Sequence, residues 1–169
     1  MQRSFSIRIV EASESDLGAV AELAAIVWRA HYPGIITHGQ IEYMLARGYS
    51  HDALLRFLTE AGSGLLLAYD RERLIGFAAY FPTGEADELK LDRLYVHQDY
   101  HGCGVGSRLI ARVEETAGAQ RLRTLILQVN KNNKAKSFYE KLGFSEIGYK
   151  DFDIGNGFFM NDYVMEKVL

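Results

Sequence analysis

Residues 88–107 read ELKLDRLYVHQDYHGCGVGS, and this segment carries the most structural information in the chain. Its first half alternates apolar and polar residues, as strands do, but the alternation slips by one residue between Leu91 and Leu94. Because side chains in a strand have a period of two, the slip predicts a β-bulge near Asp92–Arg93. Three glycines follow, each separated by one residue, and a helical pattern begins after them. We therefore expect a bulged strand, a glycine-rich turn and a helix in direct succession.

The glycine-rich turn, HGCGVGS at residues 101–107, is suited to holding a phosphate group. Glycines permit positive φ and let the backbone approach a ligand closely. Backbone amides that point into one concavity bind anions, and the N-terminus of the following helix adds partial positive charge. The alternative is a tight strand-to-helix turn without a ligand.

Two other phosphate-binding loops fit the turn poorly. A P-loop requires Gly-Lys-Ser/Thr, but Gly106 is followed by Ser107 and Arg108. A Rossmann loop requires G-x-G-x-x-G and an acidic residue about 20 positions later. The glycines here are spaced G-x-G-x-G, and no acidic residue lies between Glu115 and Glu140. The sequence therefore disfavours a nicotinamide or flavin cofactor.

The rest of the chain predicts further strands and helices around this stretch. Period-two patterns predict strands at 5–11, 64–70, 73–81, 87–97, 123–129, 144–154 and 158–168. Helical spacing and capping signals predict helices from the capping box at Ser13 to about Ala30, after Thr37, over about 51–61, after the glycine-rich turn, and from Asn132 to Leu142. This order predicts an α/β or α+β fold with a mixed sheet, in a single domain over 1–169.

Composition narrows the class of protein. The 169 residues are 48% apolar and 24% charged, as in ordinary globular domains, and the net charge of −3 disfavours a nucleic-acid binder. The single cysteine, Cys103, excludes an internal disulfide and a Cys-rich zinc site. No apolar run approaches the roughly 18 residues of a membrane helix, and the N-terminus has no signal-peptide pattern. We expect a soluble cytoplasmic protein.

Two segments at the right separation resemble the GNAT superfamily, the acyl-CoA-dependent N-acetyltransferases. The family's pyrophosphate motif is Arg or Gln, two residues, Gly, one residue, then Gly or Ala, and HGCGVG matches its glycines. The first position departs from it, since His101 replaces Arg or Gln; it acts mainly through its backbone, so binding should survive. The preceding ELKLDRLYV resembles the fourth strand, and NNKAKSFYEKLGF at 132–144 resembles the second signature. The tail at 154–169 resembles that of small bacterial members.

The resemblance implies a mixed, mostly antiparallel sheet of about seven strands flanked by helices, with acetyl-CoA as cosubstrate. The turn would cradle the pyrophosphate, and the bulged strand would pair its backbone with the pantetheine arm. Asn132 corresponds to a family Asn that bonds this arm, and is equally suited to N-cap the next helix. The implied cofactor-binding residues are Leu94, Tyr95, Val96, His101, Gly102, Cys103, Gly104, Val105, Gly106, Ser107, Asn132 and Tyr139.

The resemblance also implies direct transfer of the acetyl group to a neutral amine, without an acyl-enzyme. Tyr139 matches the family Tyr near the thioester sulfur and would protonate the leaving thiolate; its alternative is a core aromatic. An alkyl amine has a pKa of roughly 10, so the site must help remove a proton. Glu88 and Asp92 are the candidate bases, through water, although both also suit ordinary solvated strand positions.

Other readings of the reactive residues are weaker. Cys103 at a helix N-terminus would have a lowered pKa, but it occupies a variable motif position and no His-Asp arrangement accompanies it. His97 and His101 are four residues apart across a strand end and a turn, which disfavours a metal pair, so no metal is expected.

The acceptor is the least determined part. Trp28, Tyr32 and Phe159 are the candidate substrate-binding residues, in an aromatic, partly apolar pocket. The mild acidic balance suits a cationic amine such as a polyamine or amino-sugar. Acetylation of a protein amine and a non-catalytic acyl-CoA sensor are the alternatives. A homodimer is compatible with this reading, and no nucleic-acid or membrane partner is expected.

Overall fold

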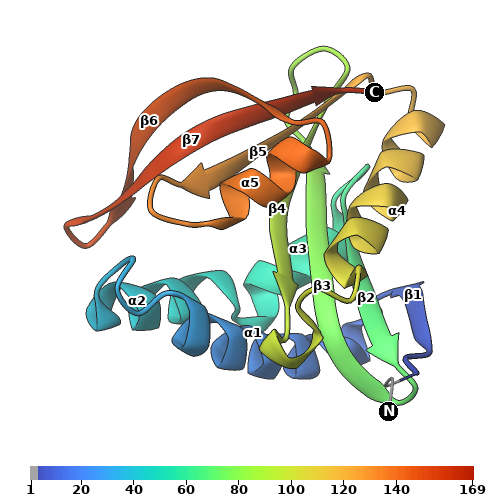
Figure 1. The fold of residues 1–169 in the computed structure, drawn as a ribbon, viewed down its shortest axis with the longest axis horizontal. Coiled ribbons are helices and arrows are strands. Elements are labelled where there is room, and N and C mark those ends of the chain that lie inside the picture. The colour runs from blue at the N-terminus through green and yellow to red at the C-terminus, as the bar shows by residue number, and fades with distance from the viewer. Residues whose placement is uncertain (1–3) are drawn as a thin grey trace.

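Seven strands form one sheet in residues 4–169, the part of the chain that the computed structural model describes (Figure 1). The strands are β1 (Ile7–Glu11), β2 (Gly64–Asp70), β3 (Arg73–Pro82), β4 (Glu88–Val96), β5 (Thr124–Asn130), β6 (Ser145–Gly155) and β7 (Phe158–Val168). They lie in the order β1-β2-β3-β4-β5-β7-β6, and every pair is antiparallel except β4 and β5. The mixed, mostly antiparallel sheet predicted from the sequence is confirmed.

Five α-helices cover the two faces of the sheet. They are α1 (Leu17–His31), α2 (His38–Gly48), α3 (His51–Thr59), α4 (Val105–Ala119) and α5 (Ala135–Lys141). Helices α1, α2 and α3 pack on one face, and α4 packs on the other with α5 beside it (Figure 1). Strand β2 contributes to the core on each face of the sheet. Leu66 packs in the core that includes α4, whereas Leu65 and Leu67 pack in the core that includes α1–α3. This strand is buried on both faces.

Local capping sets the helix starts, mostly as predicted. Thr37 Oγ1 accepts a hydrogen bond from the Gln40 amide at 3.1 Å and caps α2. The Asn132 cap is wrong: Asn133 Oδ1 accepts from the Ala135 amide at 2.9 Å, where α5 begins. The Asn132 amide instead donates to Asn130 Oδ1 at 2.9 Å, and this turn delays the helix.

The predicted bulge in β4 is confirmed. Ala79 of β3 pairs with Arg93 and the next residue, Tyr80, pairs with Leu91, so Asp92 is the extra residue. On its other side β4 pairs with β5 over only three residues, 88–90 with 124–126. Beyond this short ladder the two strands diverge, as Figure 1 shows. The divergence opens the sheet at its centre.

The hairpin of β6 and β7 reaches back toward α2. Its turn is the predicted Gly155-Asn156-Gly157, in which all three residues have positive φ. Gln40 Nε2 donates to Phe159 O at 2.7 Å, and Tyr43 Oη donates to Ile154 O at 2.8 Å. These bonds tie the hairpin tip to α2 across the sheet opening. In the described residues, helices that combine the length and apolar character of a membrane span are absent.

Candidate active site

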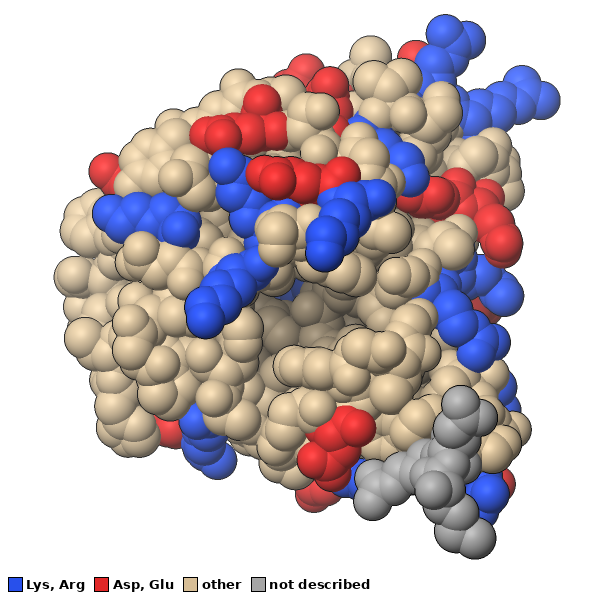
Figure 2. All heavy atoms as spheres, in the orientation of Figure 1, with Lys and Arg blue, Asp and Glu red and all other residues tan. Residues whose placement is uncertain are grey.

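A cavity of about 1040 Å³ occupies the opening between β4 and β5. Residues 91–96 of β4 and 127–130 of β5 form two of its walls, and α1, α2, α5, the glycine-rich turn and the β6–β7 hairpin also line it. Figure 2 shows a hollow near the centre of this face, with Lys and Arg side chains along its upper border, on the side of α5. The cavity therefore joins the turn to both faces of the split sheet.

The glycine-rich turn offers unpaired amides to this cavity. Gly102 and Gly104 have φ of 78° and 79°, and a Cβ atom at either position would have nothing within 4 Å. The first helical bond of α4 runs from the Arg108 amide to Gly104 O at 3.1 Å, so the amides of 105–107 precede the helical ladder. Gly106 has a packing role as well, because a Cβ there would lie 3.2 Å from Phe138 Cζ. The arrangement suits an anion.

The edge of β4 presents backbone groups to the same cavity. The His97 amide donates to Ile75 O of β3 at 2.7 Å, so the peptide groups of Val96 and Leu94 face away from β3, toward the opening. His101 Nε2 lies 2.9 Å from Val96 O and confirms this direction. The imidazole therefore bridges the start of the turn to the strand edge. An extended ligand finds free strand groups along β4.

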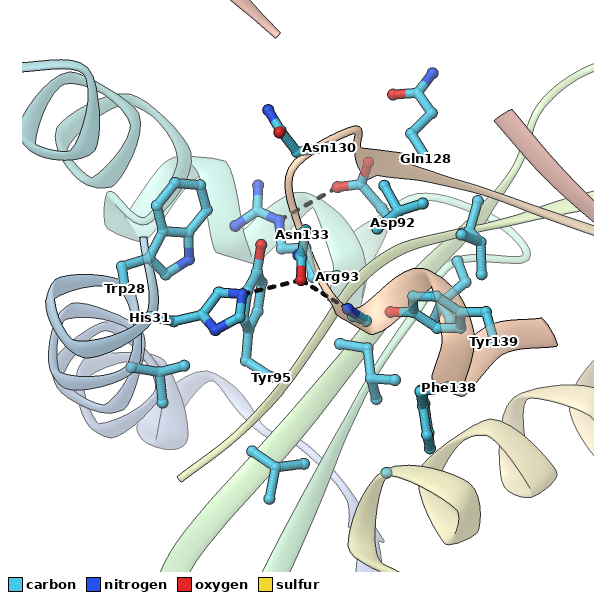
Figure 3. Close-up of a pocket in the computed structure, with 18 of the residues that line it drawn as sticks. Trp28, His31, Asp92, Arg93, Tyr95, Gln128, Asn130, Asn133, Phe138 and Tyr139 are labelled. Carbon is cyan, nitrogen blue, oxygen red and sulfur yellow. Dashed lines mark hydrogen bonds and ion pairs between the residues drawn. The ribbon is translucent and has the colours of Figure 1, made fainter. Parts of the chain in front are cut away.

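Tyr139 of α5 combines tight packing with a free hydroxyl. Its ring makes edge contacts with Phe138 and Phe144 at centroid distances of 5.3 and 5.8 Å. The side chain lines the cavity (Figure 3), and its hydroxyl bonds to none of the other described residues 4–169. Burial raises the pKa of Tyr139 well above its ordinary value, so the phenol is protonated at neutral pH. It can donate a proton into the cavity.

Asp92 reaches the cavity as part of an ion cluster. Arg93 Nε lies 3.2 Å from Asp92 Oδ2, and Lys90 Nζ lies 3.6 Å from Asp92 Oδ1. The Arg93 guanidinium also stacks over the Tyr49 ring, 4.4 Å from its centroid, and donates to Gly48 O. The bulge allows Asp92 and Arg93 to share one face of the strand. Asp92 therefore carries two cationic partners of its own.

An aromatic wall faces β4 from α1. Tyr32 Oη and Tyr95 Oη lie 3.1 Å apart, and Trp28 Nε1 donates to Tyr49 Oη at 3.2 Å. Burial raises the pKa of Tyr49 to about 12, and the pKa values of Tyr32 and Tyr95 are also raised. Trp28 and Tyr32 line the cavity while only 4% and 5% exposed. They are core residues and cavity wall at once.

The structure brings most predicted site residues to one cavity. Those on its lining are Trp28, Tyr32, Asp92, Leu94, Tyr95, Val96, His101, Gly102, Gly104, Val105, Gly106, Ser107 and Tyr139.

Four predicted residues lie outside this lining: Glu88, Cys103, Asn132 and Phe159. Glu88 Oε1 accepts from Thr83 Oγ1 at 2.8 Å, at the start of β4. Asn132 and the half-exposed Phe159 line a separate hollow of about 400 Å³. Met160 and Asp162, two residues apart on β7, line the main cavity. Because side chains alternate between the two faces of a strand, Phe159 points away from it. The roles predicted for these residues stay predictions.

Two polar groups in the cavity lie outside the sequence prediction. His31 Nε2 lies 3.1 Å from Asn133 Oδ1, which also accepts from the Ala135 amide, so His31 donates through Nε2 (Figure 3). Burial lowers the pKa of His31, which keeps the ring neutral at pH 7. The second group is Asp162, which also lines the cavity. The sequence does carry a signal for it, because Asp162 interrupts an apolar period-two series between Met160 and Val164. His31 carries no such signal.

Among residues 4–169, groups of three or more His, Cys, Asp or Glu side chains that could hold a metal ion are absent. His97 Nδ1 accepts from the Asp99 amide at 3.1 Å, and His101 is engaged at Val96 O.

Comparisons with known proteins agree with this geometry. The sequence model described as the "Acetyltransferase (GNAT) family" matches residues 21–144. An uncharacterised N-acetyltransferase of Mycobacterium tuberculosis is 30% identical over 156 residues, which are 92% of this chain and 99% of that protein. A spermidine N(1)-acetyltransferase of Thermoplasma acidophilum is 30% identical over 167 residues, covering 96% of this chain and 97% of the relative.

A solved structure shares the whole architecture. The crystal structure of the PaiA N-acetyltransferase from Thermoplasma acidophilum, in complex with coenzyme A, superposes with a TM-score of 0.83. It is 28% identical and covers 97% of this chain and 99% of that one.

Proposed function

This chain belongs to the GNAT family of acetyltransferases, and from that premise we propose that it transfers an acetyl group from acetyl-CoA directly to a primary amine of a small molecule. One observation carries the proposal: the cavity between the diverging strands β4 and β5 holds the free amides of the glycine-rich turn, the open edge of β4 and the hydroxyl of Tyr139. A phosphate-bearing thioester needs these three elements together.

The glycine-rich turn and β4 suit the two ends of coenzyme A. The amides of 105–107 and the open space at Gly102 and Gly104 would hold the pyrophosphate. The peptide groups of Leu94 and Val96 would pair with the pantetheine arm as an added strand. The PaiA relative is solved in complex with coenzyme A, which supports an acyl-CoA as the cosubstrate. His101 would release or share Val96 O as the arm enters.

The chemistry then divides between the two sides of the opening. The amine nitrogen attacks the thioester carbonyl carbon, its proton leaves through water to Asp92, and the carbon–sulfur bond breaks. The Val96 amide would polarise the carbonyl oxygen. Tyr139 would protonate the departing thiolate, which its raised pKa suits because the phenol holds its proton until the thiolate forms. Glu88 lies outside the cavity lining, which leaves Asp92 as the proposed proton acceptor.

A small-molecule acceptor is supported by the spermidine-acetylating relative and by the aromatic wall of Trp28 and Tyr32. The hairpin tip, tied to α2 by Gln40 and Tyr43, restricts the mouth on that side. A protein amine and an acyl-CoA sensor without turnover are the competing outcomes.

Two measurements test the proposal. In thermal unfolding, acetyl-CoA should raise the Tm and NAD should not; stabilisation by NAD alone would overturn the cofactor assignment. Thiol release from acetyl-CoA is then followed with a panel of alkyl monoamines, diamines, polyamines, amino-sugars and peptides bearing a free α-amine or lysine. Amine-dependent release with a small amine is expected. Turnover of peptides alone indicates a protein acceptor, and tight binding without turnover indicates a sensor.

A further inference from the structure

Asp162 is a buried carboxylate on the cavity that has no cationic side chain in contact with it among residues 4–169. It lies on β7, lines the cavity and is 5% exposed, and its Oδ1 has no hydrogen-bond partner. Burying a charge without a partner is unfavourable, so such a group is rare unless a ligand completes it. Asp162 therefore calls for a donor that the protein itself does not supply.

The other charges of the cavity have partners already. Asp92 is paired with Lys90 and Arg93, and the exposed Asp153 accepts from the Gly155 amide at 2.9 Å. The lining thus carries three carboxylates against two Lys or Arg cations. A bound cation is the group that would balance it.

An apolar surface lies directly beside Asp162. Phe152 of β6 and Met160 of β7 are paired in register, and both line the cavity two residues from Asp162 along the hairpin. Methylene groups suit this surface better than the hydroxyls of a sugar do. The combination fits an alkyl chain that ends in an ammonium group.

The position of Asp162 separates it from the reacting centre. Asp162 is paired in register with Asn130 of β5, so it stands one strand beyond the opening, about 5 Å further from β4. The β4 edge, where the thioester would lie, is on the other side of β5. An ammonium at Asp162 is therefore a different nitrogen from the one that is acetylated.

We propose that Asp162 binds the second, non-reacting ammonium of the acceptor, so that the site selects aliphatic diamines and polyamines. This inference rests on the proposed function and adds the group that determines its specificity. A protonated amine offers three N–H donors and would neutralise the carboxylate from the cavity side.

The test compares 1,4-diaminobutane with butylamine, which matches its chain length and lacks the second amine. The wild-type protein should show a kcat/KM for diaminobutane about 10- to 100-fold above that for butylamine, the usual effect of one charged hydrogen bond. Asp162→Asn should abolish this preference by raising KM for diaminobutane, with kcat changed less than about threefold. Asp153→Asn, at an exposed carboxylate on the same cavity, should keep the preference.

Other results would refute either the second-ammonium site or the proposed function. If Asp162→Asn slows both amines equally, or if the wild type does not prefer the diamine, the second-ammonium site is refuted while acetyl transfer stands. If no amine is acetylated, the proposed function fails, and calorimetric titration of diaminobutane into the protein with coenzyme A decides the site alone. Binding that Asp162→Asn weakens at least 10-fold supports it, and absence of binding refutes it.

Discussion

Tyr139 serves packing with its ring and presents only its hydroxyl to the cavity. The two edge contacts with Phe138 and Phe144 fix the ring, while the hydroxyl bonds to no other side chain or backbone group of the described residues. The core reading and the catalytic reading of this residue are therefore compatible. Removing the hydroxyl separates them.

Tyr139→Phe should slow the chemical step without unfolding the protein. The ring and its contacts remain, so the Tm should stay within a few degrees, whereas loss of a general acid costs typically 10²-fold or more. Single-turnover acetyl transfer with the best amine is the measurement, because slow product release can mask the chemical step in kcat. A change of under about threefold would return Tyr139 to the core and leave proton delivery to water.

Asp162 should make the stability of the free protein depend on pH. Burial raises its pKa from 3.8 to about 6, and Lys90 opposes the shift. The folded state therefore binds this proton more tightly than the unfolded state does. The protonated Asp162 contributes to the free energy of unfolding below about pH 4, and this contribution is lost as pH rises through about 6. Relative to Asp162→Asn, the wild-type unfolding free energy should fall by about 2 kcal/mol between about pH 4 and pH 7. Chemical unfolding of both proteins at several pH values measures this change. A difference in unfolding free energy that stays constant with pH would contradict the prediction.

At the scale of elements, the glycine-rich turn has a matched control elsewhere in the chain. Gly104 and Gly84 have φ of 79° and 89°, and a Cβ at either meets nothing within 4 Å. Valine should therefore strain both backbones equally, by about 1–2 kcal/mol. Only Gly104 borders the cavity, so Gly104→Val should weaken coenzyme A binding at least about 10-fold, whereas Gly84→Val should leave it within about twofold. Calorimetry decides, and equal affinities would remove the turn from the binding site.

The bulge in β4 can be tested by deleting its extra residue. Without Asp92, β3 and β4 regain an unbroken ladder, because Ala79 and Tyr80 then face consecutive partners. The strand should straighten and close part of the opening, so coenzyme A affinity should fall by at least about 10-fold in a protein that still folds. Asp92→Asn keeps the bulge and should retain affinity. Circular dichroism and calorimetry on both variants check this; unchanged binding after deletion would show that the opening does not depend on the bulge.

The elements were largely predictable because their signals are local. The bulge appeared as a slipped alternation around Asp92, and the Gly155-Asn156-Gly157 hairpin and the Thr37 cap needed only neighbouring residues. The side-chain cap predicted at Asn132 is formed one residue later by Asn133, because Asn130 forms a turn that depends on where β5 ends.

Site residues that depend on burial were harder to predict. Asp162 and His31 acquire their character from distant elements that exclude water, and no local pattern encodes that enclosure. Glu88 has the residue type and strand of a candidate base, yet its bond to Thr83 lies outside the cavity. Residue type and position on β4 made both Glu88 and Asp92 candidates, but they did not predict that only Asp92 of the two lines the cavity.

In the molecule as a whole, the sheet has two parts, β1–β4 and β5–β7, which meet at the short ladder between β4 and β5. Helix α4 packs on both parts, because its Leu109 and Val113 share one core cluster with Leu125 of β5 and Met165 of β7. The second part is also tied to the first by Lys167 Nζ, 2.6 Å from Glu114 Oε1, and by the bonds from α2 to the hairpin tip. Between them the cavity takes the place of continuous strand pairing.

The three-residue ladder between β4 and β5 makes this junction the place where the backbone should open most often. Few main-chain bonds need to break there, so opening should require much less free energy than global unfolding. Deuterium should enter the amides of Thr124 and Ile126, which face the β4 side, within a far shorter time than it enters β2 and β3, which are paired along their lengths. Mass spectrometry of peptides after timed labelling records this, and equal protection would contradict it. A ligand that spans both strands should slow the exchange, so the same amides would report, minute by minute, on how firmly the two parts of the sheet are held together.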